Sequence, residues 1–337
     1  MSDFYLQLEA VVEAVVILSP TTYAWFDCAS PPLAPRIVRS MTPRTARDYL
    51  LYAVQHQLYV DFYCQGSPMP AEEEDYPAFP QGMTPFLQSL SSANAGTGCP
   101  EDNWEVRAVE ENALLVRKDG LNVWAWTTGC LIPPEDSVEV GTRIALCLPK
   151  EFLNMSPGFY MALGDRELRL DDSDPVLRFY WHLTPDCAAA FVGSATTRLN
   201  AGGIPFRLKL LRDPNLYNRC DAGVIYARKR DYQSISCILA DVYHEVCSSL
   251  EPGIPAFTKA LAPGLGLAED PGDGQSFGEH RCHLLADALI AAHESGLRSV
   301  PERTRAVADR FEREGLDLAA VFLNPGSRDE YDFCVSG

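Results

Sequence analysis

Two short stretches of the chain carry residues whose types and spacing could do chemistry. The first is Arg178-Phe179-Tyr180-Trp181-His182-Leu183-Thr184-Pro185, and the second is Pro205-Phe206-Arg207-Leu208-Lys209-Leu210-Leu211-Arg212. Both alternate between polar and apolar residues with a period of two, which is typical of a half-buried strand. The polar face of the first holds Arg178, Tyr180 and His182, and that of the second holds Arg207 and Lys209.

A helix-like segment joins the two stretches, so together they are typical of a βαβ unit. Such a unit usually brings its strands into one sheet in parallel. We therefore expect His182 and Lys209 to stand side by side on one face, with arginines around them. An acid, a base and a group of cations suit chemistry on a phosphorylated substrate.

Composition limits the function classes that remain. The chain has 337 residues and a formal net charge of -18, so we expect no general affinity for nucleic acid or for an anionic membrane. No apolar run is long enough to span a bilayer, and the first residues lack the pattern of a secretory signal. The 11 cysteines are scattered and odd in number, which favours reduced thiols in a cytoplasmic protein.

The first 170 residues are expected to form a helical and β-rich scaffold region. Apolar spacing predicts a helix over Phe4–Leu18, and Thr42-Pro43 opens a second one that runs towards Cys64. Residues 65–100, with the acidic run 72–75, are typical of a long surface loop. Alternating segments between Trp104 and Leu163 predict an antiparallel meander that leads into the strand of His182.

Residues 171–337 are expected to form the catalytic region, after a polar break at residues 171–175. Thr184-Pro185-Asp186 predicts a helix start, and Asn200-Ala201-Gly202-Gly203 predicts its end. A third strand is predicted at residues 222–227, a helix from Asp231 to Val246, a Gly/Pro loop at 262–274 and a helix at 276–293. The predicted fold is α+β: N-terminal helices and an antiparallel meander, followed by a mixed sheet with a βαβ-βα core.

Several segments of this second half resemble a known family, the HopA-type proteins. They are Phe179-Tyr180-Trp181-His182-Leu183-Thr184-Pro185, Pro205-Phe206-Arg207-Leu208-Lys209, Pro255-Ala256-Phe257-Thr258-Lys259, and Gly266-Leu267-Ala268-Glu269-Asp270-Pro271 with Ser276-Phe277-Gly278. The family is named after a type III effector of plant pathogens, and it has members in actinobacterial clusters for class V lanthipeptides and thioamitides. There a small phosphotransferase-like kinase phosphorylates Ser or Thr of a precursor peptide, and the HopA-like partner is the presumed lyase.

The same order of segments is similar to the lyase domains of class III lanthipeptide synthetases and to phosphothreonine lyases. The resemblance implies that His182 is the general acid and Lys209 the general base. It implies phosphate binding by Arg219 and Arg281, and we add Arg207, Arg212 and Lys259 as candidate phosphate ligands, with Arg178 and Tyr180 as supporting residues. Those lyases usually carry a lysine two residues before the histidine, where this chain has Tyr180, so another cation or a tyrosine hydrogen bond must replace it.

The implied reaction is a β-elimination that converts phosphoserine or phosphothreonine to dehydroalanine or dehydrobutyrine. The Cα proton is weakly acidic, so the base must be strong and neutral, and a lysine whose pKa is lowered by burial or by cations meets that need. Arg207 and Arg212 lie close enough in sequence to supply those cations. Guanidinium groups suit phosphate oxygens, and histidine can protonate the leaving phosphate. No metal or other cofactor is required.

Other interpretations stay open. His182 could be a satisfied histidine of the sheet and Lys209 an edge residue whose amine reaches solvent. The basic run 228–230 is typical of a solvated turn, while His280, Cys282 and His283 supply too few ligands on one helix face for zinc. The competing function class is a non-catalytic scaffold or an effector-like binding module for a partner kinase. The expected partners are a phosphotransferase-like kinase and a leader-bearing precursor peptide.

Overall fold

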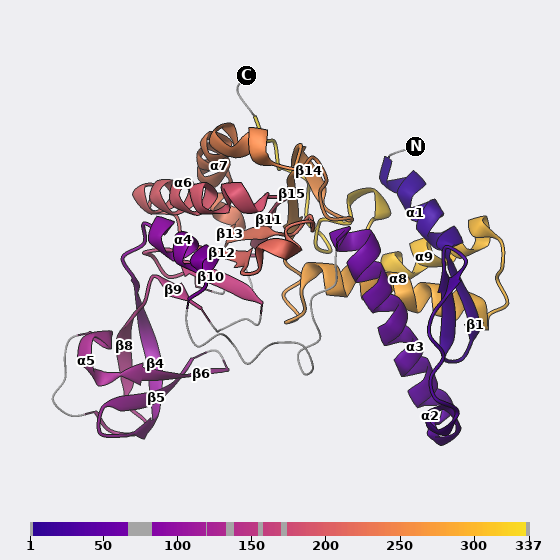
Figure 1. Ribbon diagram of the computed structural model, residues 1–337, viewed down its shortest axis with the longest axis horizontal. Coiled ribbons are helices and arrows are strands. Elements are labelled where there is room, and N and C mark those ends of the chain that lie inside the picture. The colour runs from indigo at the N-terminus through magenta and orange to yellow at the C-terminus, as the bar shows by residue number, and fades with distance from the viewer. Residues whose placement is uncertain are drawn as a thin grey trace.

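The structure, a computed structural model, describes residues 3–66, 83–118, 120–132, 138–153, 158–169 and 174–334. Helices and three antiparallel sheets make up these residues, so the α+β class is confirmed (Figure 1). Residues 67–82 of the loop expected over residues 65–100 lie outside the described residues, as do Asp119 and Asp171–Ser173. The described part of that stretch contains helix α4 (Pro85–Ala93). None of the helices in the described ranges is both long and apolar enough to cross a bilayer.

The central sheet has seven strands in the order β14-β15-β11-β13-β12-β10-β9. Their bounds are β9 (Glu151–Phe152), β10 (Phe159–Leu163), β11 (Val176–Trp181), β12 (Phe206–Leu211), β13 (Gly223–Arg228), β14 (Lys259–Ala262) and β15 (Leu265–Glu269). All neighbouring pairs are antiparallel, which differs from the mixed sheet that we predicted. The reason is that β13 inserts between β11 and β12, so the two strands of the βαβ unit run parallel without being hydrogen-bonded neighbours.

Helices α6 (Ala188–Ala201) and α7 (Tyr232–Val246) cover one face of this sheet. The apolar face of β11 points towards them, as its alternation predicts: the Trp181 ring lies 4.8 Å from that of Phe191, and Phe179 stacks on Tyr232. Helix α6 follows a 3-10 turn at Pro185–Cys187 and ends before Gly203, whose φ of 64° favours glycine. The predicted end of this helix is therefore correct, whereas the predicted start at Thr184-Pro185 is a 3-10 turn without a side-chain cap, and α6 itself begins at Ala188.

The opposite face packs against the π-helix η1 (Leu58–Cys64), which continues α3 (Pro43–Gln57), and against the start of α8 (Phe277–Glu294). Helix α3 begins with the predicted Thr42 cap, and α8 begins with a capping box between Ser276 and Glu279. The polar face of β11 points this way, because Tyr180 contacts the rings of Tyr63 and Phe277.

The N-terminal elements pack beside α8 and α9 (Val300–Arg313), at the right of Figure 1. They are α1 (Asp3–Ala14), β1 (Val15–Ser19), β2 (Thr22–Trp25), β3 (Cys28–Ala29) and α2 (Pro35–Ser40). The helix predicted to reach Leu18 thus ends at Ala14. Val15, Val16 and Ile17 are β-branched, and they pair with β2 instead of extending the helix.

A five-stranded antiparallel sheet of order β6-β5-β4-β8-β7 forms the meander that we predicted. Its elements are β4 (Cys99–Val109), β5 (Ala113–Lys118), β6 (Leu121–Trp126), α5 (Thr127–Cys130), β7 (Leu131–Ile132) and β8 (Arg143–Leu148). It has its own apolar core and lies at the lower left of Figure 1. One expected member is elsewhere: β10 pairs with β12, so the central sheet takes strands from both sides of residue 170.

Short 3-10 turns complete the connections and lead to a C-terminal segment, residues 318–334, part of which lies along β15. The turns are η3 (Pro214–Leu216), η4 (Lys229–Asp231), η5 (Cys247–Ser249) and η6 (Leu318–Ala320). The Glu269 N–H donates to the Phe322 carbonyl, and its buried carboxylate accepts from Lys229, Tyr331 and the Asn324 N–H. The Glu269 carboxylate therefore binds the C-terminal segment to the central sheet.

Candidate functional site

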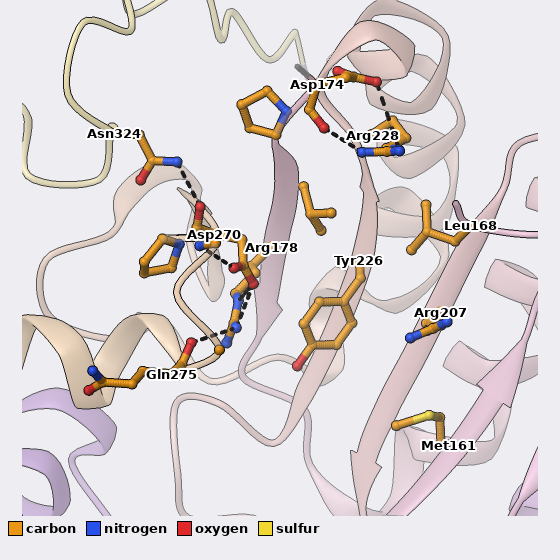
Figure 2. Close-up of a pocket in the computed structure, with 15 residues that line it drawn as sticks. Met161, Leu168, Asp174, Arg178, Arg207, Tyr226, Arg228, Asp270, Gln275 and Asn324 are labelled. Atoms are coloured by element: carbon orange, nitrogen blue, oxygen red, sulfur yellow. Dashed lines mark hydrogen bonds and ion pairs between the residues drawn. The ribbon is translucent and has the colours of Figure 1, made fainter. Parts of the chain in front are cut away.

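A cavity of about 740 Å³ opens on the polar face of the central sheet (Figure 2). Three arginines line it, one from each of three neighbouring strands: Arg178 of β11, Arg228 of β13 and Arg207 of β12. The other lining residues include Met161, Leu168, Asp174, Tyr226, Asp270, Gln275 and Asn324. Three guanidinium groups around one cavity favour an anionic ligand.

Strand register explains why two of these arginines meet there. Arg178 and Arg207 both pair with Tyr226, so the three residues form one row across β11, β13 and β12. Residues paired across neighbouring strands point to the same face of a sheet. Figure 2 shows the Tyr226 ring between the two arginines.

The three arginines differ in what already binds them. Arg178 Nε donates to Asp270 Oδ2 over 2.7 Å, and Arg228 donates to the Asp174 carbonyl. No hydrogen bond or ion pair of the Arg207 side chain with another described residue is found. Arg207 is therefore the lining arginine best able to take up an anion, while Asp270 offsets part of the charge of Arg178.

Lys209 lies on the same strand and face as Arg207, two residues further along β12. At about 3.3 Å per residue, this is a step of roughly 7 Å. Its register partner Met161 lines the cavity, which places Lys209 beside it. The ammonium nitrogen lies 3.7 Å from the centroid of the Phe159 ring, and no hydrogen bond to a described residue holds it.

The pKa of Lys209 is lowered to about 8. Burial is the main cause, and the cations Arg178 and Arg219 add to it, while the carboxylates of Asp221 and Glu279 oppose it. We expected Arg207 and Arg212, its neighbours in sequence, to have this effect. The cations that act on Lys209 come instead from the adjacent part of β11 and from the connection between β12 and β13.

His182 follows directly after β11 on the same face as Arg178 and Tyr180. Its Nδ1 lies 3.1 Å from the Gly253 carbonyl, which can only accept, so Nδ1 carries the proton and Nε2 is left to exchange one. A Cβ at residue 253 would come within 3.3 Å of this nitrogen, so glycine makes room for the ring. Burial lowers the pKa of His182, partly opposed by this hydrogen bond.

His182 and Lys209 do not stand side by side, because β13 separates their strands. Two interstrand steps amount to about 10 Å. The pKa of each group is lowered overall, and the negative charge of the same carboxylate, Asp221, partly offsets that lowering in both. The predicted acid and base thus come from the same face of the sheet, on two strands that β13 separates.

Tyr180 is buried between Tyr63 and Phe277, and it shares a row with Lys209. Burial raises the pKa of its phenol, so the hydroxyl stays protonated and can donate a hydrogen bond. The side chain that stands two residues before His182 is therefore a buried, neutral phenol, and it lies outside the cavity lining.

Arg219 is buried in a network of its own, behind the end of β12. Its Nε and Nη2 donate to the two oxygens of Asp221, both over 2.8 Å, and Nη2 also lies 3.0 Å from Cys64 Sγ. It does not line the cavity, and it acts on the site through its charge, which lowers the pKa of Lys209. Arg212 follows β12, where its backbone N–H donates to the Gly158 carbonyl, and it too lies outside the cavity lining.

The remaining two predicted phosphate cations bind the C-terminal segment. Arg281 is 1% exposed and donates to the Val321 and Leu323 carbonyls over 2.9 and 3.1 Å. Lys259 forms an ion pair with Asp329 at 2.6 Å. Neither lines the cavity. Both hold residues 321–329 against the central sheet and α8.

Sequence reasoning missed several residues of the cavity, among them Tyr226, Asp270 and Arg228. Tyr226 lies in the predicted third strand, where its alternation with Val224 could have placed it on the polar face. Asp270 lies in a segment that we treated as a Gly/Pro loop, and Arg228 in a run that we interpreted as a solvated turn. Arg228 is 2% exposed, because it ends a central strand and only the residues after it reach solvent.

No group of three potential metal ligands is found within the part of the chain that the structure describes. Cys282 is buried in the core, and His283 Nδ1 lies 3.2 Å from Gln55 Oε1. His280 Nδ1 lies 2.8 Å from Arg281 Nη1, which donates to it.

The sequence profile of the HopA1 effector protein family matches residues 152–323. This chain belongs to the HopA1 effector protein family. The matched region contains the central sheet except Glu151, the residues that line the cavity except Asn324, and both His182 and Lys209.

Two solved effector proteins are similar in structure to this HopA1 family member. One, from Pseudomonas syringae pv. tomato strain DC3000, is 15% identical with a TM-score of 0.47, covering 82% of this chain and 95% of that chain. The other, from Pseudomonas syringae pv. syringae strain 61, is 12% identical with a TM-score of 0.45, covering 95% and 97%. No curated protein sequence matches the chain.

Proposed function

We propose that this HopA1 family protein is a phosphoserine/phosphothreonine lyase, a carbon–oxygen lyase that acts on phosphate. Its substrate would be a precursor peptide phosphorylated by a kinase, and its product a peptide with dehydroalanine or dehydrobutyrine. One observation carries the proposal. Lys209, with a pKa of about 8, shares a strand and a face with Arg207 at the edge of an arginine-lined cavity.

The reaction needs one proton removed and one delivered. Neutral Lys209 Nζ would take the proton from Cα, and the electron pair of the C–H bond would form the Cα=Cβ double bond. The Cβ–O bond would break, and the phosphate would leave with its electron pair. His182 Nε2 would protonate the leaving oxygen, so the products are the dehydrated peptide and inorganic phosphate.

The cavity supplies the phosphate site in this proposal. Arg207 and Arg178 come from one row, with the Tyr226 hydroxyl between them as a further donor. A guanidinium group can bind two phosphate oxygens at once, which fixes the leaving group relative to Cα. Arg219, Arg212, Lys259 and Arg281 remain predicted phosphate ligands, although their side chains lie outside the cavity lining.

The geometry of His182 suits the role of acid. The Gly253 carbonyl fixes the ring with Nε2 available, and a phosphate dianion bound nearby would raise the lowered pKa of the imidazole.

The direct experiment is to mix the protein with phosphorylated precursor peptide and follow its mass. We expect loss of phosphoric acid without added nucleotide, and the same rate in the presence of EDTA, because the step uses only side-chain acid and base. Strict dependence of this step on a divalent ion would contradict the proposal.

A non-catalytic phosphopeptide-binding module for a partner kinase is the second candidate. The observation that favours it is the Asp270–Arg178 ion pair together with the position of His182 outside the cavity lining. Such a module would bind the phosphopeptide, and the mass of the peptide would stay unchanged however long the two are incubated together.

A further inference from the structure

Strand β6 forms one edge of the five-stranded sheet, at the end of the molecule opposite the N-terminal helices (Figure 1). Its sequence is Leu-Asn-Val-Trp-Ala-Trp, without a charged residue, proline or glycine. Exposed edges of natural sheets usually carry such residues, which block pairing with another chain. This edge lacks them, and β6 makes no hydrogen bond outside its pairing with β5 to any described residue.

The outer face of the same edge is aromatic. The inner residue Ala125 packs with Leu114 and Val116 into the small core, and Trp124 and Trp126 therefore point outward. Their exposed fractions are 52% and 67%. An antiparallel sheet with one solvated face normally carries polar residues there, so two exposed indoles at one edge indicate a contact surface.

Beside these indoles lies a cavity of about 460 Å³ that is separate from the arginine-lined cavity. It is lined by Glu110, Glu111, Asn112, Ala113, Trp124, Ala125 and Trp126. Neither glutamate forms an ion pair with a residue that the structure describes. Two carboxylates next to two indole faces favour a cation, because the charge and the aromatic faces attract it together.

We propose that β6 accepts an extended peptide segment as a sixth strand, and that this cavity takes a lysine or arginine side chain of the segment. The backbone of β6 would supply the pairing, and the side-chain cavity the selectivity, as in other cases of strand addition. The occupant is thus a basic peptide, which also suits a chain with a net charge of -18. A second copy of this acidic chain would be repelled at long range.

The test uses a short, fluorescein-labelled peptide of alternating threonine and valine with a central arginine. We expect saturable binding by anisotropy, which weakens as salt is added. Glutamate in place of the arginine should weaken it at least about tenfold, the change expected from losing a charge-assisted contact. Methylation of the peptide backbone nitrogens on the pairing side should abolish it.

Three variants locate the site, and one serves as a control. Trp126→Ser and the double change Glu110→Gln with Glu111→Gln should each weaken binding at least about tenfold, and Trp124→Lys should block the edge. Val140→Ser, another exposed apolar residue after the five-stranded sheet's β7, should leave affinity unchanged. Circular dichroism and thermal melting check that the variants fold.

Equal affinity for the arginine and glutamate peptides, or wild-type affinity in Trp126→Ser, would overturn the inference. So would a concentration-dependent dimer that Trp124→Lys dissolves, because the occupant of the edge would then be a second copy. The peptides contain no phosphate, so these outcomes are independent of the proposed lyase activity.

Discussion

Lys209 and Tyr180 lie in one row across the central sheet, on either side of Val224. The phenol of Tyr180 is neutral, so the row contains one amine and no second ammonium group. The cation that acts most on Lys209 is Arg178, one row away, and burial does more than either arginine to lower its pKa. This arrangement keeps a large part of the lysine neutral near pH 8.

Lys209→Met should abolish elimination and at the same time stabilise the protein. At pH 7 the ammonium is protonated both folded and unfolded, so the fold bears the cost of burying it. The shift from 10.5 to about 8 limits that cost to about 3 kcal/mol, and we expect a gain of about 1–3 kcal/mol in unfolding free energy. Denaturant titration and mass spectrometry measure the two effects.

The pH dependence of this gain provides the control. Between about 8 and 10.5 the unfolded state binds more protons at residue 209, so the stability of the wild type rises with pH and the advantage of methionine shrinks. A constant difference over this range would mean that the buried ammonium is not its source. Normal elimination by Lys209→Met would place the base elsewhere.

The pH profile of kcat/KM should separate the two catalytic roles. With Lys209 as base and His182 as acid, activity requires the lysine neutral and the imidazole protonated. Because the pKa of His182 is lowered and that of Lys209 is about 8, the wild-type profile should fall above about 8. The substrate phosphate also titrates on the acid side of the profile, so only the fall on the alkaline side reports on the two enzyme groups alone.

His182→Ala should change the shape of that profile as well as its height. We expect a loss of about 10²–10⁴ in rate, the usual range for an acid–base group. Without an acid to deprotonate, activity should rise to about pH 8 and then stay level, since only Lys209 still titrates. An alkaline fall that persists in His182→Ala would assign that limb to another group.

Much of the catalytic half could be predicted because its local signals agree with its packing. Strong alternation gave the correct faces of β11 and β12, and the glycine pair gave the end of α6. The errors have physical causes. The helix expected to reach Leu18 ends at Ala14 because Val15–Ile17 are β-branched and find a partner strand, which no local pattern shows. Likewise, nothing local indicates that β13 inserts between β11 and β12.

The candidate site was predictable by residue type more than by position. Arginines near Lys209 in sequence looked equivalent, yet only Arg207 shares both its strand and the cavity. Arg219 is almost fully buried and binds Asp221, and neither residue lines the cavity. Arg281 is almost fully buried and binds the carbonyl of Val321, which is 40 residues away in sequence. Which arginine faces the cavity depends on strand order and on where the C-terminal segment lies, and both are set by tertiary packing.

Arg207→Gln should raise KM for the phosphopeptide more than it lowers kcat. A hydrogen bond to a charged group contributes about 1.5–3 kcal/mol, so we expect an increase of about 10- to 100-fold in KM. Arg44→Gln is the matched control, because Arg44 is 92% exposed on α3 and loses only a weak pair with Asp48. An equal effect of the two substitutions would argue against a phosphate role for Arg207.

Arg281→Met should lower stability and leave KM of the folded enzyme unchanged. The substitution leaves the buried Val321 and Leu323 carbonyls without donors, and we expect a loss of about 2–4 kcal/mol. Lys259→Ala, which breaks a partly exposed pair with Asp329, should cost under about 1 kcal/mol. A raised KM in Arg281→Met would instead support the phosphate role that the family resemblance implies.

A standing complex with a phosphotransferase-like kinase is the last prediction. The phosphorylated intermediate would be consumed only by the lyase, so holding both enzymes together avoids its loss by diffusion. The N-terminal elements offer exposed apolar side chains such as Leu6, Leu18 and Phe26, and the net charge of -18 would attract a basic face of the kinase or a basic leader peptide.

We therefore expect the kinase to co-purify with this protein and to elute with it in size-exclusion chromatography. The double substitution Leu18→Ser with Phe26→Ser should weaken this co-elution. Val140→Ser is again the control for an exposed apolar residue elsewhere. If kinase and lyase elute separately at micromolar concentration, with and without precursor peptide, the lyase must act on released phosphopeptide.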